Sequence, residues 1–384
     1  MSAARTYLDY NATAPLRPEA RAALIAALDA PCNASSVHAE GRRARALLDK
    51  ARGEVASLVG AEPADVTFTS GATEAANWVL SLPWATIVSS PIEHPCIAAS
   101  IEKHMARKVP LTVGSDGLID LAVLAATLAA APRDAADSKR SALLVVQHAN
   151  NETGVVQPIE NIAALAKAHG FALLVDAVQS AGRLPIDAAK LAIDYVMVAS
   201  HKIGGPPGVG ALVARRDAPP LAPLLVGGGQ ERGRRAGTEN VAAIAGFGAA
   251  ASAAAREIAG IDRLRQLRDL LEAGLRRASP ETVVIAALAP RLPNTSLVAL
   301  AGTRAETLVI ALDLAGIAAS AGAACASGKT KRSGVLDAMG VPGELAEGAV
   351  RFSLGWASTE SDIEACIEAW LGAVKSRRPA LRVA

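Results

Sequence analysis

Short apolar runs alternate with longer amphipathic stretches through the first two thirds of the chain. The apolar runs, which we interpret as strands, cover residues 86–88, 111–113, 142–146, 171–175, 195–198 and 210–213. The amphipathic stretches, in which apolar residues recur at helical spacing, cover residues 17–30, 38–59, 119–131 and 159–169. Nearly continuous apolar strands that alternate with helices are typical of a parallel sheet covered on both faces, so the pattern predicts an α/β fold.

The pattern changes after residue 240. A long helical stretch covers residues 241–277, and two short strand candidates at 283–285 and 297–300 flank a helix at 306–315. We therefore predict a domain boundary near residue 256, followed by a smaller α+β unit.

Two polar residues end neighbouring apolar runs. Asp176 closes the run at 171–175, and Lys202 follows the run at 195–198 in a Gly/Pro-rich turn. Open α/β sheets bind ligands at the carboxyl edge of their strands. A lysine there can form a Schiff base, and an aspartate can hold a protonated pyridine nitrogen, as pyridoxal phosphate (PLP) requires. The alternative is a surface lysine in a loop beside an aspartate that caps a helix.

Other polar residues fall at strand ends and turns. Residues 65–74 lead from a β-rich run through Ser70-Gly71 into a helix, whose free N–H groups suit a phosphate or a simple cap. His94 is a candidate for stacking on a flat ring or moving a proton, the alternative being a structural histidine. Asn151 is placed to reach a ring substituent, and Asn33 lies in a polar turn that faces a ligand or is only a turn.

Three further features carry open alternatives. The loop at 227–240, rich in glycine and charge, suits an anion, a subunit contact or a solvated linker. Arg351 sits inside a β-rich run, where it serves as a fork for a carboxylate or as half of an internal ion pair. Cys325 lies among small residues at 318–328, which favours an accessible loop over the burial usual for a free cysteine.

Composition narrows the class of protein. The 384-residue chain has a net charge of +2 with acids and bases mostly interspersed, so we expect no nucleic-acid binding. The apolar stretch at 241–255 is too short to span a bilayer, and the N-terminus has no apolar signal core. The four cysteines form no CxxC pair, which indicates neither a zinc site nor a disulfide scaffold. We expect a soluble, cytoplasmic protein that makes no membrane contact.

Taken together, these segments resemble the cysteine desulfurases, the NifS/IscS-like branch of the class V, fold-type I PLP enzymes. The motifs that carry the resemblance, in order, are YLDYNATAP, FTSGATE, EHP, NNETGVVQP, VDAVQS, SHKIGGPPGVG, GGGQERGRRAGTEN, the small-residue cysteine loop and RFSLG. The resemblance implies a large PLP-binding domain at 15–256 with a mostly parallel sheet. It also implies a small α+β domain made of 1–14 and 257–384, with a mobile cysteine loop at about 318–334.

The resemblance implies cofactor roles for the strand-end residues. Lys202 would hold PLP as a Schiff base and later move the substrate's Cα proton. Asp176 would keep the pyridine nitrogen protonated, and His94 would stack on the ring and serve in acid–base steps. The other contacts to the ring and phosphate would come from Ala72, Thr73, Asn151, Gln179, Ser200 and His201. Thr238 would reach the phosphate of the neighbouring subunit, which implies a homodimer.

Substrate roles follow from the same resemblance. Arg351 would bind the carboxylate of L-cysteine, and Asn33 is a weaker candidate for a substrate contact. Cys325 would attack the substrate sulfur as a thiolate, which leaves an enzyme persulfide and yields L-alanine. A sulfur-acceptor or scaffold protein would then receive the sulfur. No permanent metal site is implied, although Cys325 is a candidate transient ligand of an iron–sulfur cluster.

Three departures from the family pattern leave questions open. The early turn that resembles Gly-Asn-Pro in the family reads Cys-Asn-Ala here, which makes Asn33 a weak candidate. In the family, the serine that contacts the phosphate usually lies three residues before the lysine, where this chain has Ala199. Ser200 lies one residue closer to Lys202, and which hydroxyl meets the phosphate is left open. The basic segment at 329–332 replaces a milder one and is a candidate determinant of acceptor choice.

The predicted function is conversion of L-cysteine to L-alanine with sulfur transfer, for iron–sulfur cluster assembly or other thiolation. The nearest alternatives are selenocysteine lysis and class V transamination. Cys325 distinguishes the predicted function from transamination, because transaminases need no such nucleophile. A non-enzymatic sulfur-relay scaffold is the alternative from a different class, which a PLP absorption band lost on Lys202→Ala would exclude.

Overall fold

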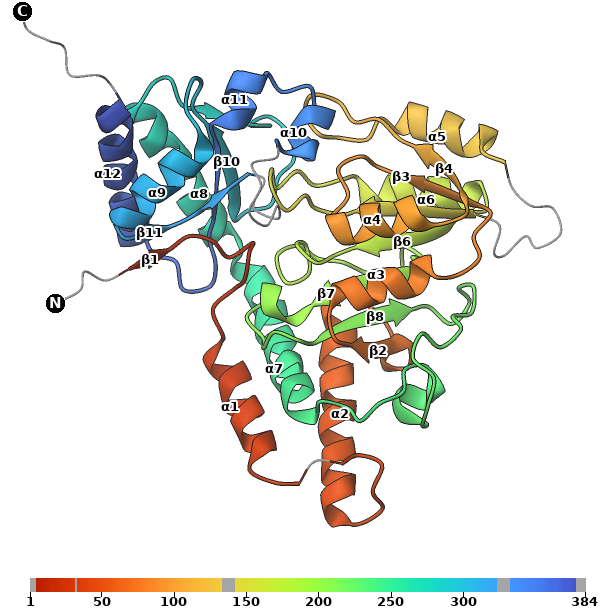
Figure 1. Ribbon diagram of the computed structural model, residues 1–384. Coiled ribbons are helices and arrows are strands. Elements are labelled where there is room, and N and C mark those ends of the chain that lie inside the picture. Colours follow the sequence, from red (N-terminus) through yellow and green to blue (C-terminus); the bar gives the residue numbers. More distant parts are fainter. Residues whose placement is uncertain (1–4, 32, 133–141, 323–331, 378–384) are drawn as a thin grey trace, which may run out of the picture.

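The computed structural model describes residues 5–31, 33–132, 142–322 and 332–377 (Figure 1). These residues form a large α/β part built on a seven-stranded sheet and a smaller part built on a four-stranded sheet. Cys32 and Cys325 lie outside the described residues, and so does most of the basic segment at 329–332.

The seven-stranded sheet has the strand order β2-β8-β7-β6-β5-β3-β4. Its strands are β2 (Val66–Thr69), β3 (Thr86–Ser89), β4 (Arg107–Pro110), β5 (Ala142–Gln147), β6 (Ala172–Asp176), β7 (Tyr195–Ala199) and β8 (Gly210–Ala214). Neighbours from β4 to β7 are parallel, whereas β8 is antiparallel to both β7 and β2. The sheet is therefore mostly parallel, and the predicted α/β fold class is confirmed.

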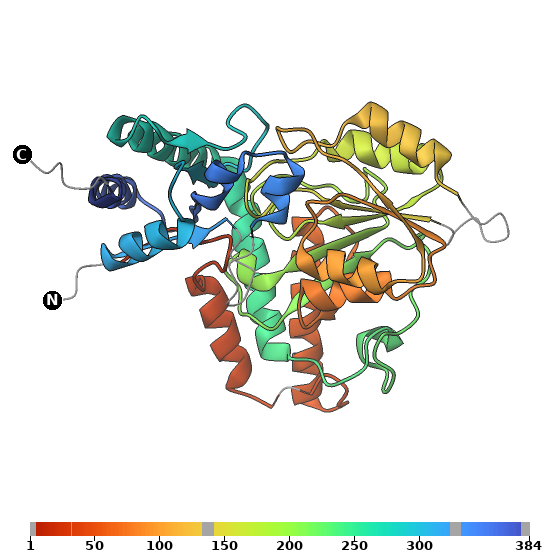
Figure 2. The same cartoon turned by 45° about the horizontal axis from the view of Figure 1, so that its top comes forward.

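Helices cover both faces of this sheet because successive strand side chains point to opposite sides. In β5, Leu143 and Val145 pack against α3 (Ala72–Leu80) and α4 (Pro95–Lys103). Leu144 and Val146 belong to the core on the other face. The helices on that face are α2 (Ala39–Leu58), α5 (Leu121–Ala130), α6 (Ile159–Ala168) and α7 (Val241–Glu257). Helices lie on both sides of the sheet (Figures 1 and 2). Burial on both faces explains why the strands are almost wholly apolar.

The smaller part combines both ends of the chain. Its antiparallel sheet has the order β12-β13-β10-β9, and β1 (Thr6–Tyr7) pairs in parallel with β11 (Ile317–Ala318). The sheet strands are β9 (Val283–Val284), β10 (Thr295–Ala299), β12 (Ser320–Ala321) and β13 (Ala349–Ser353). The helices are α8 (Asp262–Ala278), α9 (Ala305–Leu314), α10 (Gly334–Ala338), α11 (Gly343–Glu347) and α12 (Glu360–Arg377). The domain bounds drawn from the sequence stay a prediction.

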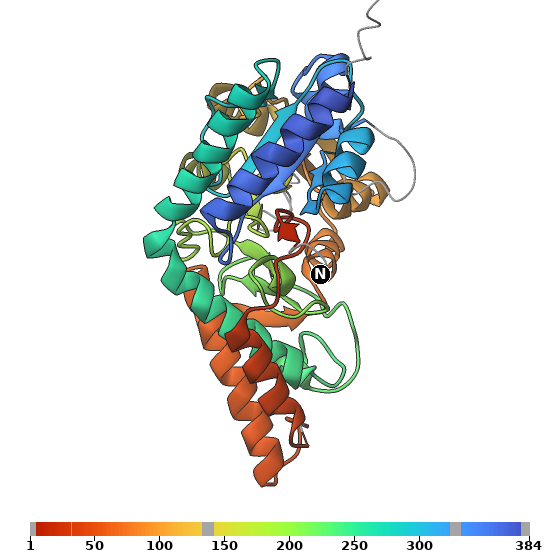
Figure 3. The same ribbon diagram turned by 90° about the vertical axis from the view of Figure 1, so that its left-hand side faces the viewer.

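Two of the predicted elements are wrong. The helix expected at 241–277 is two helices, α7 and α8, separated by a 3-10 turn at Ile258–Gly260. Glycine is a poor helix former, and the two helices join different cores, with α8 lying beside α12 (Figure 3). The strand expected at 111–113 is instead β4, whose mostly exposed, partly basic residues gave no apolar signal because β4 is an edge strand.

Helix α7 is long and mostly apolar. Together with the following turn, residues 241–260 are long and apolar enough to cross a membrane by length and composition. The stretch is nevertheless 67% buried inside the fold, where α7 packs against α1 (Pro18–Leu28) and α2. Its apolar character is therefore explained by its place in the core.

Candidate active site

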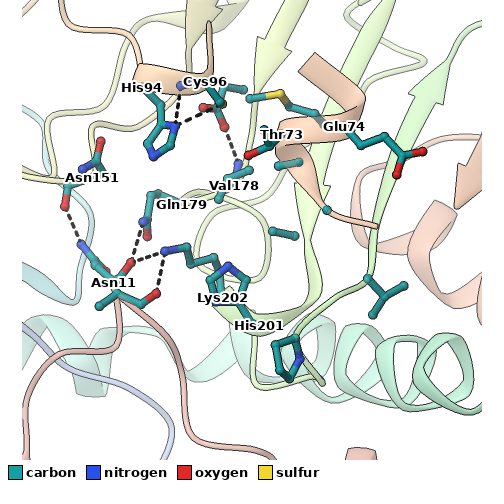
Figure 4. Close-up of a pocket in the computed structure, with 18 of the residues that line it drawn as sticks. Asn11, Thr73, Glu74, His94, Cys96, Asn151, Val178, Gln179, His201 and Lys202 are labelled. Atoms are coloured by element: carbon teal, nitrogen blue, oxygen red, sulfur yellow. Dashed lines mark hydrogen bonds between the residues drawn. The ribbon is translucent and has the colours of Figure 1, made fainter. Parts of the chain in front are cut away.

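A cavity of about 480 Å³ opens where the carboxyl ends of β5, β6 and β7 meet (Figure 4). The N-terminus of α3, the segment after β1 and one residue of β13 complete its wall. The polar or charged residues that line it are Asn11, Ser70, Thr73, Glu74, His94, Cys96, Gln147, Asn151, Asp176, Gln179, His201, Lys202 and Arg351. The volume and the few convergent polar groups are typical of a small-molecule site.

Lys202 enters the cavity from the turn after β7. The chain passes from β7 through a 3-10 turn, Ser200–Lys202, into a loop that returns as β8. Gly204 and Gly208 have φ of +84° and +79°, a left-handed backbone that glycine adopts without strain. The Nζ atom donates hydrogen bonds to the carbonyl oxygens of Asn11 and Ala12, each at 2.7 Å. The lysine is thus oriented by the N-terminal segment.

Asp176 ends β6 and is almost fully buried. One carboxylate oxygen, Oδ1, accepts a hydrogen bond from the backbone N–H of Val178 at 2.9 Å. Burial raises the pKa of Asp176 to about 6, although that hydrogen bond and the charge of Lys202 oppose the shift. Such a carboxyl gains most from a cationic partner in the cavity, and a protonated ring nitrogen is one.

His94 caps the N-terminus of α4 with its own ring. Its Nδ1 atom accepts a hydrogen bond from the backbone N–H of Cys96 at 3.2 Å and lies 3.1 Å from the Cys96 sulfur (Figure 4). Burial, and then the charge of Lys202, lower the pKa of His94. A neutral ring whose Nδ1 is an acceptor carries its proton on Nε2, so His94 offers the cavity an N–H donor.

The first turn of α3 forms the end of the cavity that suits a phosphate. The first N–H groups of a helix have no partner within the helix, and Ala72 and Thr73 occupy these positions on the cavity wall. A Cβ at Gly210 would lie 2.8 Å from the Gly71 Cα atom, so glycine allows β8 to pass close to this turn. Burial lowers the pKa of the neighbouring His201 to about 4, which leaves its ring neutral at physiological pH.

Asn151 and Gln179 are both oriented by neighbours. Gln147 donates from Nε2 to Oδ1 of Asn151 at 3.4 Å, and Gln179 donates from Nε2 to the carbonyl oxygen of Asn11 at 3.0 Å. Arg183 donates to Oε1 of Gln179, which determines which end of that amide faces Asn11. Both amides therefore present defined polar atoms to the cavity (Figure 4).

Arg351 reaches the cavity from β13, although its side chain is only 3% exposed. Its Nη2 atom lies 2.8 Å from Oδ1 of Asp9, and its Nη1 atom donates to the carbonyl oxygen of Asn151 at 2.9 Å. Arg351 is therefore half of an internal ion pair and also lines the cavity, whereas its use as a fork for a carboxylate stays a prediction.

Three predicted residues are not brought to this cavity. Ser200 is fully buried, and its Oγ atom lies 2.1 Å from where a Cβ on Gly205 would be, so it packs under the loop. Ala199, one residue earlier, is the one that faces the cavity because strand side chains alternate. The side chain of Ser200 therefore does not face the cavity, and the phosphate contact predicted for it stays a prediction that this geometry does not support. Asn33 and Thr238 are exposed and do not line the cavity of their own chain.

Several cavity residues were not predicted. Gln147 is the last residue of β5, so the strand-end rule applied to Asp176 would have found it. Cys96 follows His94 at a helix start, but its position offers no separate signal. Asn11 precedes the large sheet by more than fifty residues, and only the fold brings it to the cavity. The fold likewise brings Asp9, which does not line the cavity, into contact with Arg351.

The cavity has the features that PLP requires. A lysine, a buried carboxylate with a raised pKa and a helix N-terminus occupy three sides of one volume of about 480 Å³. These would serve the aldehyde, the ring nitrogen and the phosphate respectively. Within the described residues, no group of three or more His, Cys, Asp or Glu side chains could hold a metal ion.

Comparisons with known proteins identify the family of this chain. The family model for aminotransferase class V matches residues 6–366. A cysteine desulfurase of Cereibacter sphaeroides is 41% identical, over 95% of this chain and 94% of its own. An IscS-like cysteine desulfurase of Mycobacterium tuberculosis is 38% identical, over 98% of both chains. The crystal structure of a NifS-like protein from Rickettsia africae superposes with a TM-score of 0.87 at 35% identity, over 97% of this chain and 99% of the other.

Proposed function

Because the chain belongs to the class V aminotransferases, within their cysteine desulfurases, we propose that it converts L-cysteine to L-alanine and passes the sulfur on as a persulfide. The observation that carries the proposal is the meeting of Lys202, Asp176 and Arg351 in one cavity. A Schiff-base lysine, a ring-nitrogen partner and a carboxylate fork are the groups that a PLP enzyme needs to act on an amino acid.

PLP would be held at three points by this chain. Lys202 would bind its aldehyde, Asp176 its ring nitrogen, and the N–H groups of Ala72 and Thr73 its phosphate. When bound, PLP supplies an electron sink for the bonds at the substrate's Cα. The neutral ring of His201 and the amides of Asn151 and Gln179 line the same volume and would complete the contacts.

The substrate would be oriented by Arg351, which would bind its carboxylate with N–H groups that point away from Asp9. Once released from the cofactor, Lys202 would carry the Cα proton on its Nζ atom. His94 would donate a hydrogen bond from Nε2 into the cavity, because its Nδ1 already accepts from the N–H of Cys96. Asp176 and Arg351 are both almost fully buried, which strengthens their interaction with charged groups of a ligand.

Cys325 would be the residue that takes the sulfur. Its thiolate would attack the substrate sulfur, so that an S–S bond forms while the substrate's C–S bond breaks and its electrons remain with the carbon skeleton. Protonation of that skeleton then gives L-alanine. Two cysteines of the described chain do not suit this role, because burial raises the pKa of Cys96 to about 12 and also raises that of the fully buried Cys366.

The wider setting is also part of the proposal. A homodimer is supported by Thr238, which is exposed, does not line the cavity of its own chain and would reach the phosphate of a second chain's cofactor. The similarity to an IscS-like protein supports sulfur delivery to iron–sulfur cluster assembly through an acceptor protein. A cytoplasmic location is supported by the free thiols of Cys96 and Cys366.

The test is to supply L-cysteine to the PLP-loaded enzyme and to measure alanine and sulfide for wild type, Cys325→Ser and Lys202→Ala. Wild type should form both products in the presence of a reductant. Cys325→Ser should keep the cofactor's absorption band and lose both products, whereas Lys202→Ala should lose the band itself. If Cys325→Ser forms both at the wild-type rate, the persulfide mechanism is wrong.

A further inference from the structure

Asp9 lies behind Arg351, and its carboxylate joins two neighbouring strands. Its Oδ1 atom is 2.8 Å from Nη2 of Arg351, with the two side chains 16% and 3% exposed respectively. Its Oδ2 atom accepts a hydrogen bond from the hydroxyl of Ser320 at 2.7 Å. Ser320 of β12 is directly opposite Arg351 of β13 in the sheet register. Asp9 is therefore held from both strands, and Arg351 is held by Asp9.

Arg351 retains donors for a second anion. A guanidinium has five N–H groups. Within the part of the chain that the structure describes, one is taken by Asp9 and one by the carbonyl oxygen of Asn151. The buried Nε atom has no hydrogen-bond partner among the described residues. The two contacts thus fix the position of the Arg351 guanidinium, while its other N–H groups stay available at the cavity wall.

The segment that carries Asp9 also holds the other cation of the site. Two residues later, the carbonyl oxygens of Asn11 and Ala12 each accept a hydrogen bond from Nζ of Lys202. The segment itself is fastened to the smaller sheet, since the N–H of Asn11 donates to the hydroxyl of Ser353 at 2.9 Å. Residues 9–12 therefore contact both the lysine and the arginine that would bracket an amino-acid substrate.

We propose that Asp9 is a positioning residue that holds the Arg351 guanidinium in place for the substrate's carboxylate, with residues 9–12 setting the spacing between Arg351 and Lys202. The inference rests on the proposed function in that it assigns a carboxylate ligand to this arginine. A buried ion pair is by itself weak evidence for a stabilising role, because desolvation offsets its Coulombic attraction. Because Arg351 lines the cavity, the pair with Asp9 can instead hold the guanidinium in position for a ligand.

The experiment compares the binding of L-alanine and of ethylamine to the PLP-loaded enzyme, followed through the cofactor's absorption spectrum. The two ligands differ only by the carboxylate. In Asp9→Ala the affinity for L-alanine should fall about tenfold or more, which corresponds to losing one oriented charged contact. The affinity for ethylamine should not change. Asp9→Asn keeps an acceptor for Nη2 and should recover L-alanine binding to within about threefold of wild type.

A matched control is Asp313→Ala, which removes an exposed aspartate that pairs with Arg5 in the same part of the molecule. It should leave both affinities unchanged. If Asp9→Ala fails to fold, Asp9→Glu, which keeps the charge but shifts it by one methylene, should raise the KM for L-cysteine with little change in kcat. The proposal is overturned if Asp9→Ala binds L-alanine as wild type does, or if it loses both ligands equally.

The same measurements separate this inference from the proposed function. A wild-type enzyme that binds L-alanine through Arg351 but releases no sulfide from L-cysteine would contradict the proposed function and leave the role of Asp9 intact. A wild-type enzyme that binds L-alanine no better than ethylamine would overturn the role of Asp9, whatever its activity.

Discussion

The carboxylate of Glu152 accepts a hydrogen bond from the hydroxyl of Ser333 at 2.5 Å, which joins residues 181 positions apart. Ser333 is also the N-cap of α10, where its hydroxyl accepts from the N–H of Leu336. Burial raises the pKa of Glu152 from 4.5 to about 7, while Ser333 and Arg351 oppose the shift. The carboxyl group of Glu152 therefore gains or loses its proton near physiological pH.

We expect the raised pKa of Glu152 to make the folded protein less stable as pH increases. The folded state binds the proton more tightly than the unfolded state, so between about pH 4.5 and 7 the free energy of unfolding falls with increasing pH and then levels off. Glu152→Gln removes this effect. The free energy of unfolding of Glu152→Gln minus that of wild type should be about 3 kcal/mol larger at pH 8 than at pH 5.

Urea unfolding at the two pH values measures this difference. The matched control is Glu344→Gln, which changes an exposed glutamate on α11 in the same part of the chain. The difference in the free energy of unfolding between Glu344→Gln and wild type should be the same at pH 5 and at pH 8. An equal effect of Glu152→Gln at pH 5 and pH 8 would show that Glu152 titrates at its ordinary pKa.

Cys96 should be dispensable as a nucleophile although it lines the active-site cavity. Burial raises the pKa of its thiol to about 12, so almost none of it is ionised at neutral pH. Cys96→Ala also preserves the backbone N–H that orients His94. We expect sulfide release within about threefold of wild type, since only a weak thiol contact is lost. Mass spectrometry of the enzyme after turnover should find no persulfide on Cys96, and finding it there would refute this prediction.

Asp176 should make PLP binding depend on pH. Its pKa of about 6 means that it is ionised above this value and protonated below it in the cofactor-free protein. A protonated carboxyl cannot stabilise a pyridinium, so the dissociation constant for PLP should rise by about tenfold for each pH unit below 6. Asp176→Asn should bind PLP at least about tenfold more weakly at pH 7.5 and should lose this additional pH dependence.

The control for Asp176 is its neighbour Glu93. Burial raises the pKa of Glu93 well above 4.5, and the negative charge of Asp176 adds to this. Glu93 does not line the cavity, and the amide of Glu93→Gln can still accept the hydrogen bond from the N–H of Gln147. Glu93→Gln should therefore bind PLP as wild type does. The measurement is spectroscopic titration of cofactor-free enzyme between pH 5 and 8. A wild-type pH profile identical to that of Asp176→Asn would rule out the role given to Asp176.

Ser200 should contribute nothing to cofactor binding. Its hydroxyl is buried and has no hydrogen-bond partner among the described residues, and it does not line the cavity. Ser200→Ala should leave the affinity for PLP unchanged and raise the free energy of unfolding by about 1 kcal/mol, because an unsatisfied polar group is removed. Thr73→Ala, at the cavity end of α3, should instead weaken PLP binding. Loss of PLP affinity in Ser200→Ala would contradict the observed geometry.

Local pattern was sufficient to predict most of the large sheet. Strands such as β5 and β6 are buried on both faces, so their apolar runs stand out, and Asp176 and Lys202 were located because each follows such a run. The same reasoning placed β4 at 111–113 instead of 107–110, since an exposed edge strand has no apolar requirement. It also joined α7 and α8, which share a helical pattern but belong to different cores.

The sequence by itself therefore determined the α/β class, the carboxyl-edge location of the cavity and the presence there of its lysine, aspartate and histidine. Only the tertiary structure decided which side chains face the cavity. Ser200 and Ala199 are adjacent in sequence, yet the turn after β7 points the serine inward and the alanine to the site. Asp9 pairs with Arg351 across 342 residues. Such contacts depend on how distant segments pack, and no local pattern of hydrophobicity or propensity records that.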